Sequence, residues 1–377
     1  MKPQKVLVAM SGGVDSSVAA MLMKKKGYEV IGVFMKNWSD TKNELGECSW
    51  REERRMAMKI ASSLNIPLMT LDLEKKYRKE VVEEMFKKYR KGITPNPDID
   101  CNKKIKFPEL IRFAKKLGAD KVVTGHYARI KKIKINEKNK NPALNKKRDD
   151  NKKEYKLLRA KDESKDQSYF LYTLTQDELK HSLFPIGDYT KKKIRKIAKK
   201  AGFPNFDKKS TVGICFIGKI NLKDFLSKKI KPKKGKILNP DGDIIGEHDG
   251  IYYYTIGQRL GPRYGFEIDR RDEECKNLKK WYVASKNAKK NIIIAAPEGH
   301  PLLYRKEITL TQPHWINKAP KRGDKIFSRI RQVGELIPST IKGNKIILNK
   351  AITGVSEGQA IVLYKGEEVL GGGVIKF

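Results

Sequence analysis

The stretch KVLVAMSGGVDSS, residues 5–17, sets the expected fold of this 377-residue chain. The run from Lys5 to Met10 is largely apolar, as in a buried strand, and an amphipathic segment that ends at Gly27 follows it. Paired glycines between a strand and a helix let the backbone approach an anion closely, and the first turn of a helix offers unpaired N–H groups. The stretch therefore predicts a phosphate-binding loop.

The loop differs from the Walker A motif, because it lacks the lysine and the spacing GxxxxGK[ST]. A near match at 213–219 has Ile220 where the motif has Ser or Thr, and we treat it as a coincidence. Asp15 would repel a phosphate unless it caps the helix or helps to hold a cation. A plain strand-to-helix turn is the alternative interpretation of the loop.

Strand and helix patterns alternate through the first half of the chain. Strand patterns lie at 6–10, 30–35, 67–73 and 122–127, and helix patterns lie at 15–26, 51–64, 75–91, 107–117, 166–175 and 190–201. This alternation predicts an α/β fold with a doubly wound parallel sheet, in which ligands bind at the carboxyl ends of the strands.

The second half of the chain has short alternating runs separated by Gly, Pro and Asn, which is typical of β structure. We expect the doubly wound domain at 1–205, a small β-rich central domain at 206–295 and a C-terminal β-barrel at 296–377. The Lys-rich segment at 131–156 is too polar to pack, so we interpret it as a basic insertion whose middle is a loop between two hairpin strands.

The chain carries a formal net charge of +38, from 82 Lys and Arg against 44 Asp and Glu. Such a surface attracts nucleic acid, and a generally Lys-rich composition is the alternative explanation. The sequence has no run of apolar residues long enough to span a membrane and no signal-peptide pattern, so we expect a cytoplasmic protein without a membrane partner.

The four cysteines, Cys48, Cys101, Cys215 and Cys275, form no CxxC pair, which argues against zinc and against a cysteine-ligated iron–sulfur cluster. Lysines at 103, 104 and 106 follow Cys101, and positive neighbours favour the thiolate form. Cys215 lies in an apolar run. Taken singly, each of these two is also typical of a buried core residue, and Asn-Pro-Asp before Cys101 is typical of a turn.

Longer stretches carry a family resemblance. SGGVDSS resembles the pyrophosphate-binding loop of the PP-loop ATP pyrophosphatases. NPDIDCNKKIKF (96–107) and STVGICFIG (210–218) resemble the two cysteine motifs of the tRNA-specific 2-thiouridylases. The similarity continues through VFMKNW (33–38), TGHYAR (124–129), KDQSYFLYTL (165–174), GIYYYTIGQRLG (250–261), WYVA (281–284) and EGQAIVLYKGEEVLGGGVI (357–375). Two departures are an extra residue before Cys215 and Ile330 in place of a family aromatic.

The resemblance implies a reaction. ATP adenylates the 2-oxygen of the wobble uridine, and AMP and pyrophosphate leave. Cys215 carries a persulfide whose terminal sulfur attacks carbon 2 of the base. Cys101 then attacks the bridging sulfur or otherwise frees the product, which leaves a Cys101–Cys215 disulfide for a reductant to reset. Asp98 acts as an acid or base near the uridine, or only orients it.

The resemblance also assigns binding residues. The ATP contacts are Ala9, Met10, Ser11, Gly12, Gly13, Val14, Asp15, Ser16, Met35 and Gly125. The contacts to tRNA or to its target base are Asn96, Pro97, Asp98, His126, Lys165, Asp166, Gln167, Arg329, Ile330 and Gln359. Core packing for Met35, a structural strand-end role for His126, and solvated surface charges for Lys165 and Arg329 are the alternatives.

The resemblance implies ATP with Mg²⁺ as substrate, and no iron–sulfur cluster, zinc or other protein-held metal. It implies a catalytic domain at 1–205 and a tRNA-contacting C-terminal barrel. The implied partners are tRNAs for Lys, Glu and Gln and a persulfide relay that begins at a cysteine desulfurase; we expect a monomer. A PP-loop ligase acting on a small molecule, a passive RNA-binding protein and a PP-loop thiolase with an iron–sulfur cluster are the alternatives.

Overall fold

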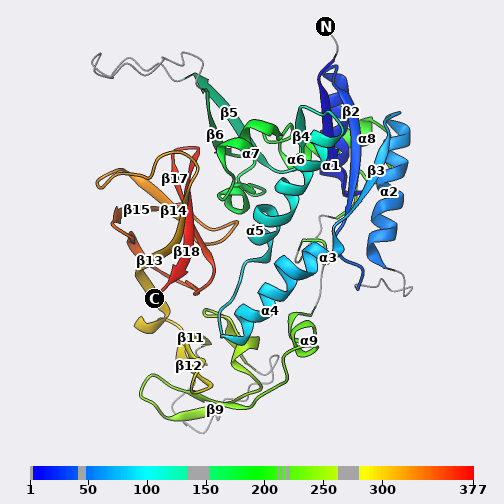
Figure 1. Ribbon diagram of the computed structural model, residues 1–377. Helices are drawn as coiled ribbons and strands as arrows, with labels where there is room; N and C mark the ends of the chain where they lie inside the picture. The colour runs from blue at the N-terminus through cyan, green and yellow to red at the C-terminus, as the bar shows by residue number, and fades with distance from the viewer. Residues whose placement is uncertain are drawn as a thin grey trace.

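The computed structural model describes residues 3–40, 48–134, 153–209, 213, 215–217, 221–261 and 280–377 (Figure 1). The middle of the basic insertion, the extra residue before Cys215 and Cys275 therefore lie outside the described residues.

The first domain is built on a five-stranded parallel sheet with the strand order β3-β2-β1-β4-β7. The strands are β1 (Lys5–Ala9), β2 (Glu29–Lys36), β3 (Leu68–Asp72), β4 (Lys121–Val123) and β7 (Ser182–Leu183). Successive side chains of β1 enter different cores, since Val6 and Val8 belong to one buried cluster and Leu7 to another. Both faces of the sheet are thus covered, and the predicted doubly wound fold is confirmed.

Helices cover the two faces of this sheet. The core on the Val6 side includes α1 (Val14–Lys25), α2 (Ser49–Ser63) and α8 (Lys191–Lys200). The core on the Leu7 side includes α4 (Glu83–Arg90) and α6 (Phe107–Lys116), and it continues without a break into the central domain. Because α1 begins directly after β1, the loop at 10–13 lies at the carboxyl edge of the sheet.

Two predictions of secondary structure are wrong: one strand ends earlier than expected, and one expected α-helix is a short 3₁₀ turn. The strand expected at 122–127 ends at Val123, and the chain then leaves the sheet to pass Gly125, which packs against the first turn of α1. The helix expected at 166–175 is only a short 3₁₀ turn, Ser168–Leu171. The apolar spacing there comes from buried aromatic rings, while the carboxylate of Asp166 accepts the backbone N–H groups of Ala160 and Ser168 and so favours a turn.

Two long helical segments contain π-helical turns. One joins α3 (Glu74–Tyr77) to α4 through Arg78–Val82, within the single helix predicted at 75–91. The other joins α5 (Pro97–Cys101) to α6 through Asn102–Lys106. Such turns are rare and are frequent at functional sites. The second one directly follows Cys101.

The central domain contains a five-stranded sheet of order β10-β11-β12-β8-β9 together with α9 (Leu222–Ser227). Its strands are β8 (Gly235–Leu238), β9 (Ile244–His248), β10 (Arg259–Leu260), β11 (Trp281–Asn287) and β12 (Ile292–Pro297). The α9 side chain Phe225 stacks on Phe86 of α4 with ring centroids 5.3 Å apart. The central domain is therefore packed directly on the first domain.

The C-terminal domain is a closed six-stranded barrel, because β13 pairs with both β16 and β18. Its strands are β13 (Tyr304–Trp315), β14 (Ile326–Arg329), β15 (Ile337–Lys342), β16 (Lys345–Thr353), β17 (Ala360–Lys365) and β18 (Glu368–Lys376). The hairpin of β5 (Ala128–Lys134) and β6 (Lys153–Arg159) leaves the first domain and pairs with β18. The first domain thus contributes two strands to the sheet of the last one.

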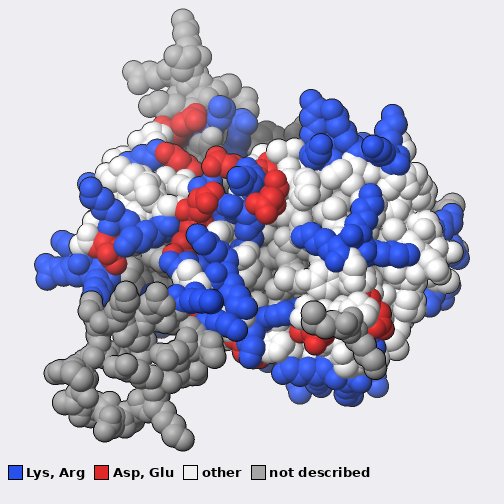
Figure 2. All heavy atoms as spheres, turned by 90° about the horizontal axis from the view of Figure 1, so that it is seen from above, with Lys and Arg blue, Asp and Glu red and all other residues white. Residues whose placement is uncertain are grey.

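Positive charge is spread over the face of the molecule that Figure 2 shows. Figure 2 shows Lys and Arg side chains distributed over the visible face, with Asp and Glu gathered in a few groups. The net charge of the chain therefore does not by itself locate a nucleic-acid face. None of the helices among the described residues combines the length and apolar character that a membrane span requires.

Candidate active site

The loop between β1 and α1 is shaped by its hydroxyl groups. The Ser16 hydroxyl accepts the backbone N–H of Ser11 at 3.2 Å and donates to the Gly13 carbonyl at 3.0 Å. Gly12 has a φ of +73°, and a side chain there would collide with the carbonyl oxygen of Glu53 in α2. The loop is therefore held open around the start of α1 without a bulky side chain, as a phosphate cradle requires.

Asp15 is held by neighbouring groups. Both of its carboxylate oxygens lie 2.7 Å from the Lys191 ammonium, and the Tyr127 hydroxyl donates to it at 2.7 Å. The Asn205 amide donates to the Gly12 carbonyl and to the Ser17 hydroxyl, each at 3.0 Å. Lys191, Tyr127 and Asn205 were missed from the sequence, since nothing in their local pattern indicates a partner so far away in the chain.

The remaining predicted ATP contacts lie at the same edge of the sheet. A Cβ on Gly125 would be 2.7 Å from the Ser16 backbone nitrogen, so Gly125 lies directly against the first turn of α1. Met10 donates its backbone N–H to Val33 at 2.8 Å, which joins the loop to β2. The Met35 side chain is buried in a core cluster near the end of β2.

Cys101 and Cys215 lie together although they are remote in sequence. Cys101 is fully buried at the end of α5, and its side chain is within hydrogen-bonding reach of Cys215. Asp98 accepts the backbone N–H of Cys215 at 2.8 Å, and the Tyr77 hydroxyl donates to the Cys215 carbonyl at 2.6 Å. Both thiols are free. Asp98 and Tyr77 thus fix the cysteine segment against α5.

Lys106 and Asp98 are the charged groups that act on Cys215. The hydrogen bond with Cys101 and burial raise the pKa of Cys215 well above its usual range, and Lys106 opposes this rise. Burial lowers the pKa of Lys106, but the two thiols and Asp98 raise it further, so the lysine stays charged. The resting Cys215 is therefore a thiol, and the Lys106 ammonium is placed to stabilise a thiolate once a proton leaves.

His126 lies between Lys106 of the thiol site and Thr124, which follows β4. Burial and the charge of Lys106 hold the pKa of His126 well below its usual range, so the ring is neutral. Lys106 can only donate, and its ammonium lies 3.4 Å from Nε2. The proton of the ring is therefore on Nδ1, which lies 2.7 Å from the Thr124 hydroxyl.

The predicted target-base loop, residues 94–98, is hydrogen-bonded to the barrel. Gln359, before β17, donates to the carbonyls of Thr94 at 2.9 Å and Pro95 at 2.8 Å. Its side-chain oxygen lies 3.3 Å from the Asn96 amide nitrogen, and Asn96 caps α5 by accepting the Ile99 N–H. Asn96, Pro97, Asp98 and Gln359 are thereby brought together beside the two cysteines.

The other predicted tRNA contacts lie in different surroundings. Asp166 is fully buried and pairs with the equally buried Arg329 at 2.7 Å, so the interpretation of Arg329 as a solvated surface charge is wrong. Ile330 is also buried, and Gln167 accepts the Tyr127 backbone N–H at 2.9 Å. Only Lys165 of this group is exposed. Direct contact of RNA with Asp166 would require the ion pair to open.

Each domain matches a known family. Residues 4–219 match the family described as tRNA methyl transferase HUP domain, residues 223–297 match the tRNA methyl transferase PRC-barrel domain, and residues 305–375 match the Aminomethyltransferase beta-barrel domain. The parallel sheet with its glycine-rich loop, followed by two β domains, therefore defines a protein of the HUP-domain class.

Full-length relatives identify the family. The chain is 42% identical to the tRNA-specific 2-thiouridylase MnmA of Coxiella burnetii (strain Dugway 5J108-111), over 99% of this chain and 98% of the relative. It is 40% identical to the tRNA-specific 2-thiouridylase MnmA of Bacillus subtilis (strain 168), over 98% and 94%. The chain belongs to the family of the tRNA-specific 2-thiouridylases, and the resemblance found in its sequence is confirmed.

The solved structures are less similar to the chain than these relatives are. An NMN synthetase from Francisella tularensis is 15% identical, with a TM-score of 0.32, over 55% of this chain and 66% of that chain. A 4-thiouridine synthetase in complex with RNA and bound ATP is 15% identical, with a TM-score of 0.35, over 60% and 50%. Similarity at this level carries no conclusion about this chain.

Proposed function

We propose that this tRNA-uridine 2-sulfurtransferase activates the 2-oxygen of the wobble uridine with ATP and replaces it with sulfur carried on Cys215. The observation that supports this best is the convergence of Cys101, Cys215 and Asp98 in one site. Lys106 and His126 connect this site to Thr124, and the adjacent Gly125 lies against the first turn of α1. A small-molecule ligase or a passive RNA-binding protein gives no reason for two thiols in this place.

The first step uses the loop at 9–16. The uridine 2-oxygen attacks the α-phosphate of ATP, the bond to the β-phosphate breaks, and pyrophosphate leaves. The N–H groups at the start of α1 then face the phosphates, and Gly125 leaves space beside them. Both oxygens of Asp15 are taken by Lys191, and the described residues hold no cluster of three metal-binding side chains, so we propose that Mg²⁺ enters with ATP.

The second step transfers sulfur. The terminal sulfur of a Cys215 persulfide attacks carbon 2, and AMP leaves with the former 2-oxygen. The Cys101 sulfur then attacks the Cys215 sulfur, the bond between Cys215 and the transferred sulfur breaks, and 2-thiouridine and a Cys101–Cys215 disulfide result. An external dithiol reduces this disulfide. The Lys106 ammonium stabilises the attacking sulfur anions, and Asp98 orients or protonates the base.

The remaining assignments follow the family resemblance. We propose that tRNAs for Lys, Glu and Gln are the substrates, that a relay from a cysteine desulfurase supplies the persulfide, and that the chain acts as a cytoplasmic monomer. We also propose the domain boundaries at 205 and 295, with RNA contacting the C-terminal barrel.

The test is formation of 2-thiouridine. The purified chain is incubated with unmodified tRNA, ATP, Mg²⁺ and a persulfide source, and nucleosides are measured by mass spectrometry. Cys101→Ser and Cys215→Ser are expected to give no product, while Cys48→Ser, a free cysteine before α2, is the matched control. Full product from either active-site variant would contradict the mechanism, and pyrophosphate release without tRNA would favour a small-molecule ligase.

A further inference from the structure

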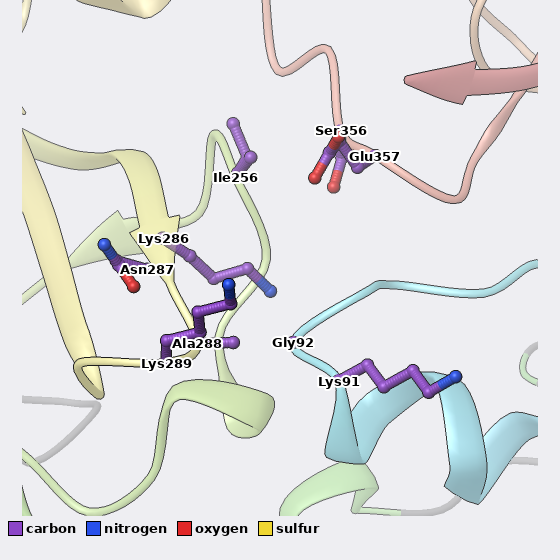
Figure 3. Close-up of a pocket in the computed structure, with 9 residues that line it drawn as sticks. All are labelled: Lys91, Gly92, Ile256, Lys286, Asn287, Ala288, Lys289, Ser356 and Glu357. Carbon is purple, nitrogen blue, oxygen red and sulfur yellow. The ribbon is translucent and has the colours of Figure 1, made fainter. Parts of the chain in front are cut away.

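A pocket outside the site just described lies where the three domains meet. It has a volume of about 320 Å³. Its lining comes from the end of α4, from the central domain and from the turn before β17, namely Lys91, Gly92, Ile256, Lys286, Asn287, Ala288, Lys289, Ser356 and Glu357 (Figure 3). None of the assigned ATP-binding or thiol residues contributes to it.

Lys286 is the least exposed lysine in this lining. Its ammonium donates to the Tyr254 carbonyl at 2.7 Å, which is its one acceptor among the described residues, although an ammonium can donate three hydrogen bonds. Lys286 and Lys289 both extend toward the middle of the pocket, whereas Lys91 points away along α4 (Figure 3). The pocket therefore offers donors from two lysines, with the buried Ser356 beside them.

The pocket shares a wall with the predicted target-base loop. The Thr94 backbone N–H donates to the Glu357 carbonyl at 3.3 Å, and Gln359 donates to Thr94 and Pro95 on the other side. Gly92 in the lining is four positions from Asn96, a span of at most about 14 Å in an extended chain. An RNA strand that delivers a base to that loop therefore runs its backbone close to the pocket.

We propose that this pocket is a subsite for one phosphate group of the bound tRNA backbone, held by Lys286 and Lys289. The proposal rests on the proposed function, because it takes the RNA to be the polyanion at the neighbouring loop. Two ammonium groups suit a phosphate. Glu357 is the acidic residue of the lining, and one of its carboxylate oxygens accepts the Phe377 N–H at 3.1 Å. Free phosphate or pyrophosphate has the same chemistry, so the test separates the sources.

The protonation state of Lys286 makes phosphate binding at this subsite depend on pH. Burial lowers the pKa of Lys286 to about 8, while Glu357 raises it. Lys91 from α4 and Lys289 from the turn after β11 are the other charged groups in the lining. A bound phosphate favours the charged lysine, so tRNA affinity is expected to be highest below pH 8 and to fall as the pH rises through that value.

The test measures tRNA binding by the full chain over a range of salt concentrations. Lys286→Met is expected to weaken binding about 3- to 10-fold at moderate salt and to reduce the slope of log affinity against log salt by about 1. Lys290→Met, on the same turn but outside the lining, is the matched control and is expected to keep the wild-type slope. At pH 9 Lys286→Arg is expected to retain the affinity that the wild type loses.

Several outcomes would overturn the proposal. A folded Lys286→Met chain with wild-type affinity and slope is one, and an equal loss at pH 9 in wild type and Lys286→Arg is another. If Lys286→Met does not fold, Lys289→Met and the pH series on the wild type decide. Inorganic phosphate and pyrophosphate are titrated in parallel: binding of either that Lys286→Met abolishes, with tRNA binding unchanged, would assign the pocket to a free anion.

The proposed function is tested separately in the same samples. At saturating tRNA, Lys286→Met is expected to form 2-thiouridine at the wild-type rate with a raised KM for tRNA. Absence of 2-thiouridine from the wild type would reject the proposed function and leave the binding result standing, so the two failures are distinguishable.

Discussion

At the scale of single residues, Asp98 has one observed task and one proposed task. Its carboxylate holds the backbone N–H of Cys215, a residue 117 positions away, and it also lies where the target base is expected. Asparagine keeps an acceptor oxygen but cannot exchange a proton, whereas alanine removes both functions. The two variants therefore separate positioning from acid–base chemistry.

Asp98→Asn is expected to lower the thiolation rate by about 10²-fold or more, since general acid–base catalysis contributes at that level. Under a mild oxidant it is expected to form the Cys101–Cys215 disulfide nearly as fast as the wild type, while Asp98→Ala forms it more slowly. Nucleoside mass spectrometry and disulfide mapping supply the measurements. A fully active Asp98→Asn chain would leave Asp98 with an orienting task alone.

The Lys106 ammonium is expected to control the reactivity of Cys215. The hydrogen bond with Cys101 and burial raise the pKa of Cys215, and Lys106 lowers it. Removing the charge in Lys106→Met therefore raises this pKa further, so less thiolate is present at any pH below it. Alkylation of Cys215 at pH 8, followed by site-resolved mass spectrometry, is expected to slow about tenfold per unit of pKa rise. Lys106→Arg keeps the charge and serves as the control; an unchanged rate in Lys106→Met would refute this electrostatic role.

Asn37, just after β2, is a buried amide whose side chain has no hydrogen-bond partner among the described residues. It is 1% exposed, and within the part of the chain that the structure describes neither its side-chain nitrogen nor its side-chain oxygen has a hydrogen bond. Asn37→Leu is therefore expected to raise the free energy of unfolding by about 1–2 kcal/mol. Asn205→Leu, which removes two hydrogen bonds to the glycine-rich loop, is expected to lower it by a similar amount. Urea denaturation compares the two; destabilisation by both would mean that Asn37 gains partners in solution.

At the scale of elements, the local sequence pattern predicted those helices and strands whose conformation depends on neighbouring residues in the chain. The strand and helix around the glycine-rich loop follow from their periodicity. The segment at 166–175 has a similar apolar spacing but forms a turn, because Asp166 is drawn inward by Arg329 on β14, 163 positions away. No local pattern contains that partner. The same limit explains why Lys191 was missed, since its contact with Asp15 crosses 176 positions.

The pair of Asp166 and Arg329 is expected to fasten this turn to the barrel. Arg329→Met leaves a buried carboxylate without its main counter-charge, which is expected to cost about 3–5 kcal/mol of unfolding free energy. Adding Asp166→Asn removes the unpaired charge and is expected to recover part of that loss. Chemical denaturation of the single and double variants measures both changes; additive losses would show that the two groups do not interact.

At the scale of the whole molecule, the candidate site depends on more than one domain. The first domain supplies the glycine-rich loop and Cys101, and Gln359 of the barrel fastens the loop before Cys101. Motif similarity identified the family, and it predicted the roles of the two cysteines and of the glycine-rich loop. It did not indicate which domains are in contact. Those contacts join residues that are far apart in the sequence, and no local pattern predicts such pairs.

The hairpin of β5 and β6 has a consequence for anyone who divides the protein. β6 pairs with β18 through its backbone. A fragment that ends at residue 205 therefore exposes the edge of β6, and the fragment 206–377 exposes the matching edge of β18. Such a fragment is expected to associate with itself in size-exclusion chromatography, and adding residues 206–377 in trans is expected to suppress this. A dispersed, monomeric fragment would refute that expectation. Three family domains can therefore be told apart along the sequence, but the backbone pairing of β6 with β18 joins the first of them to the last.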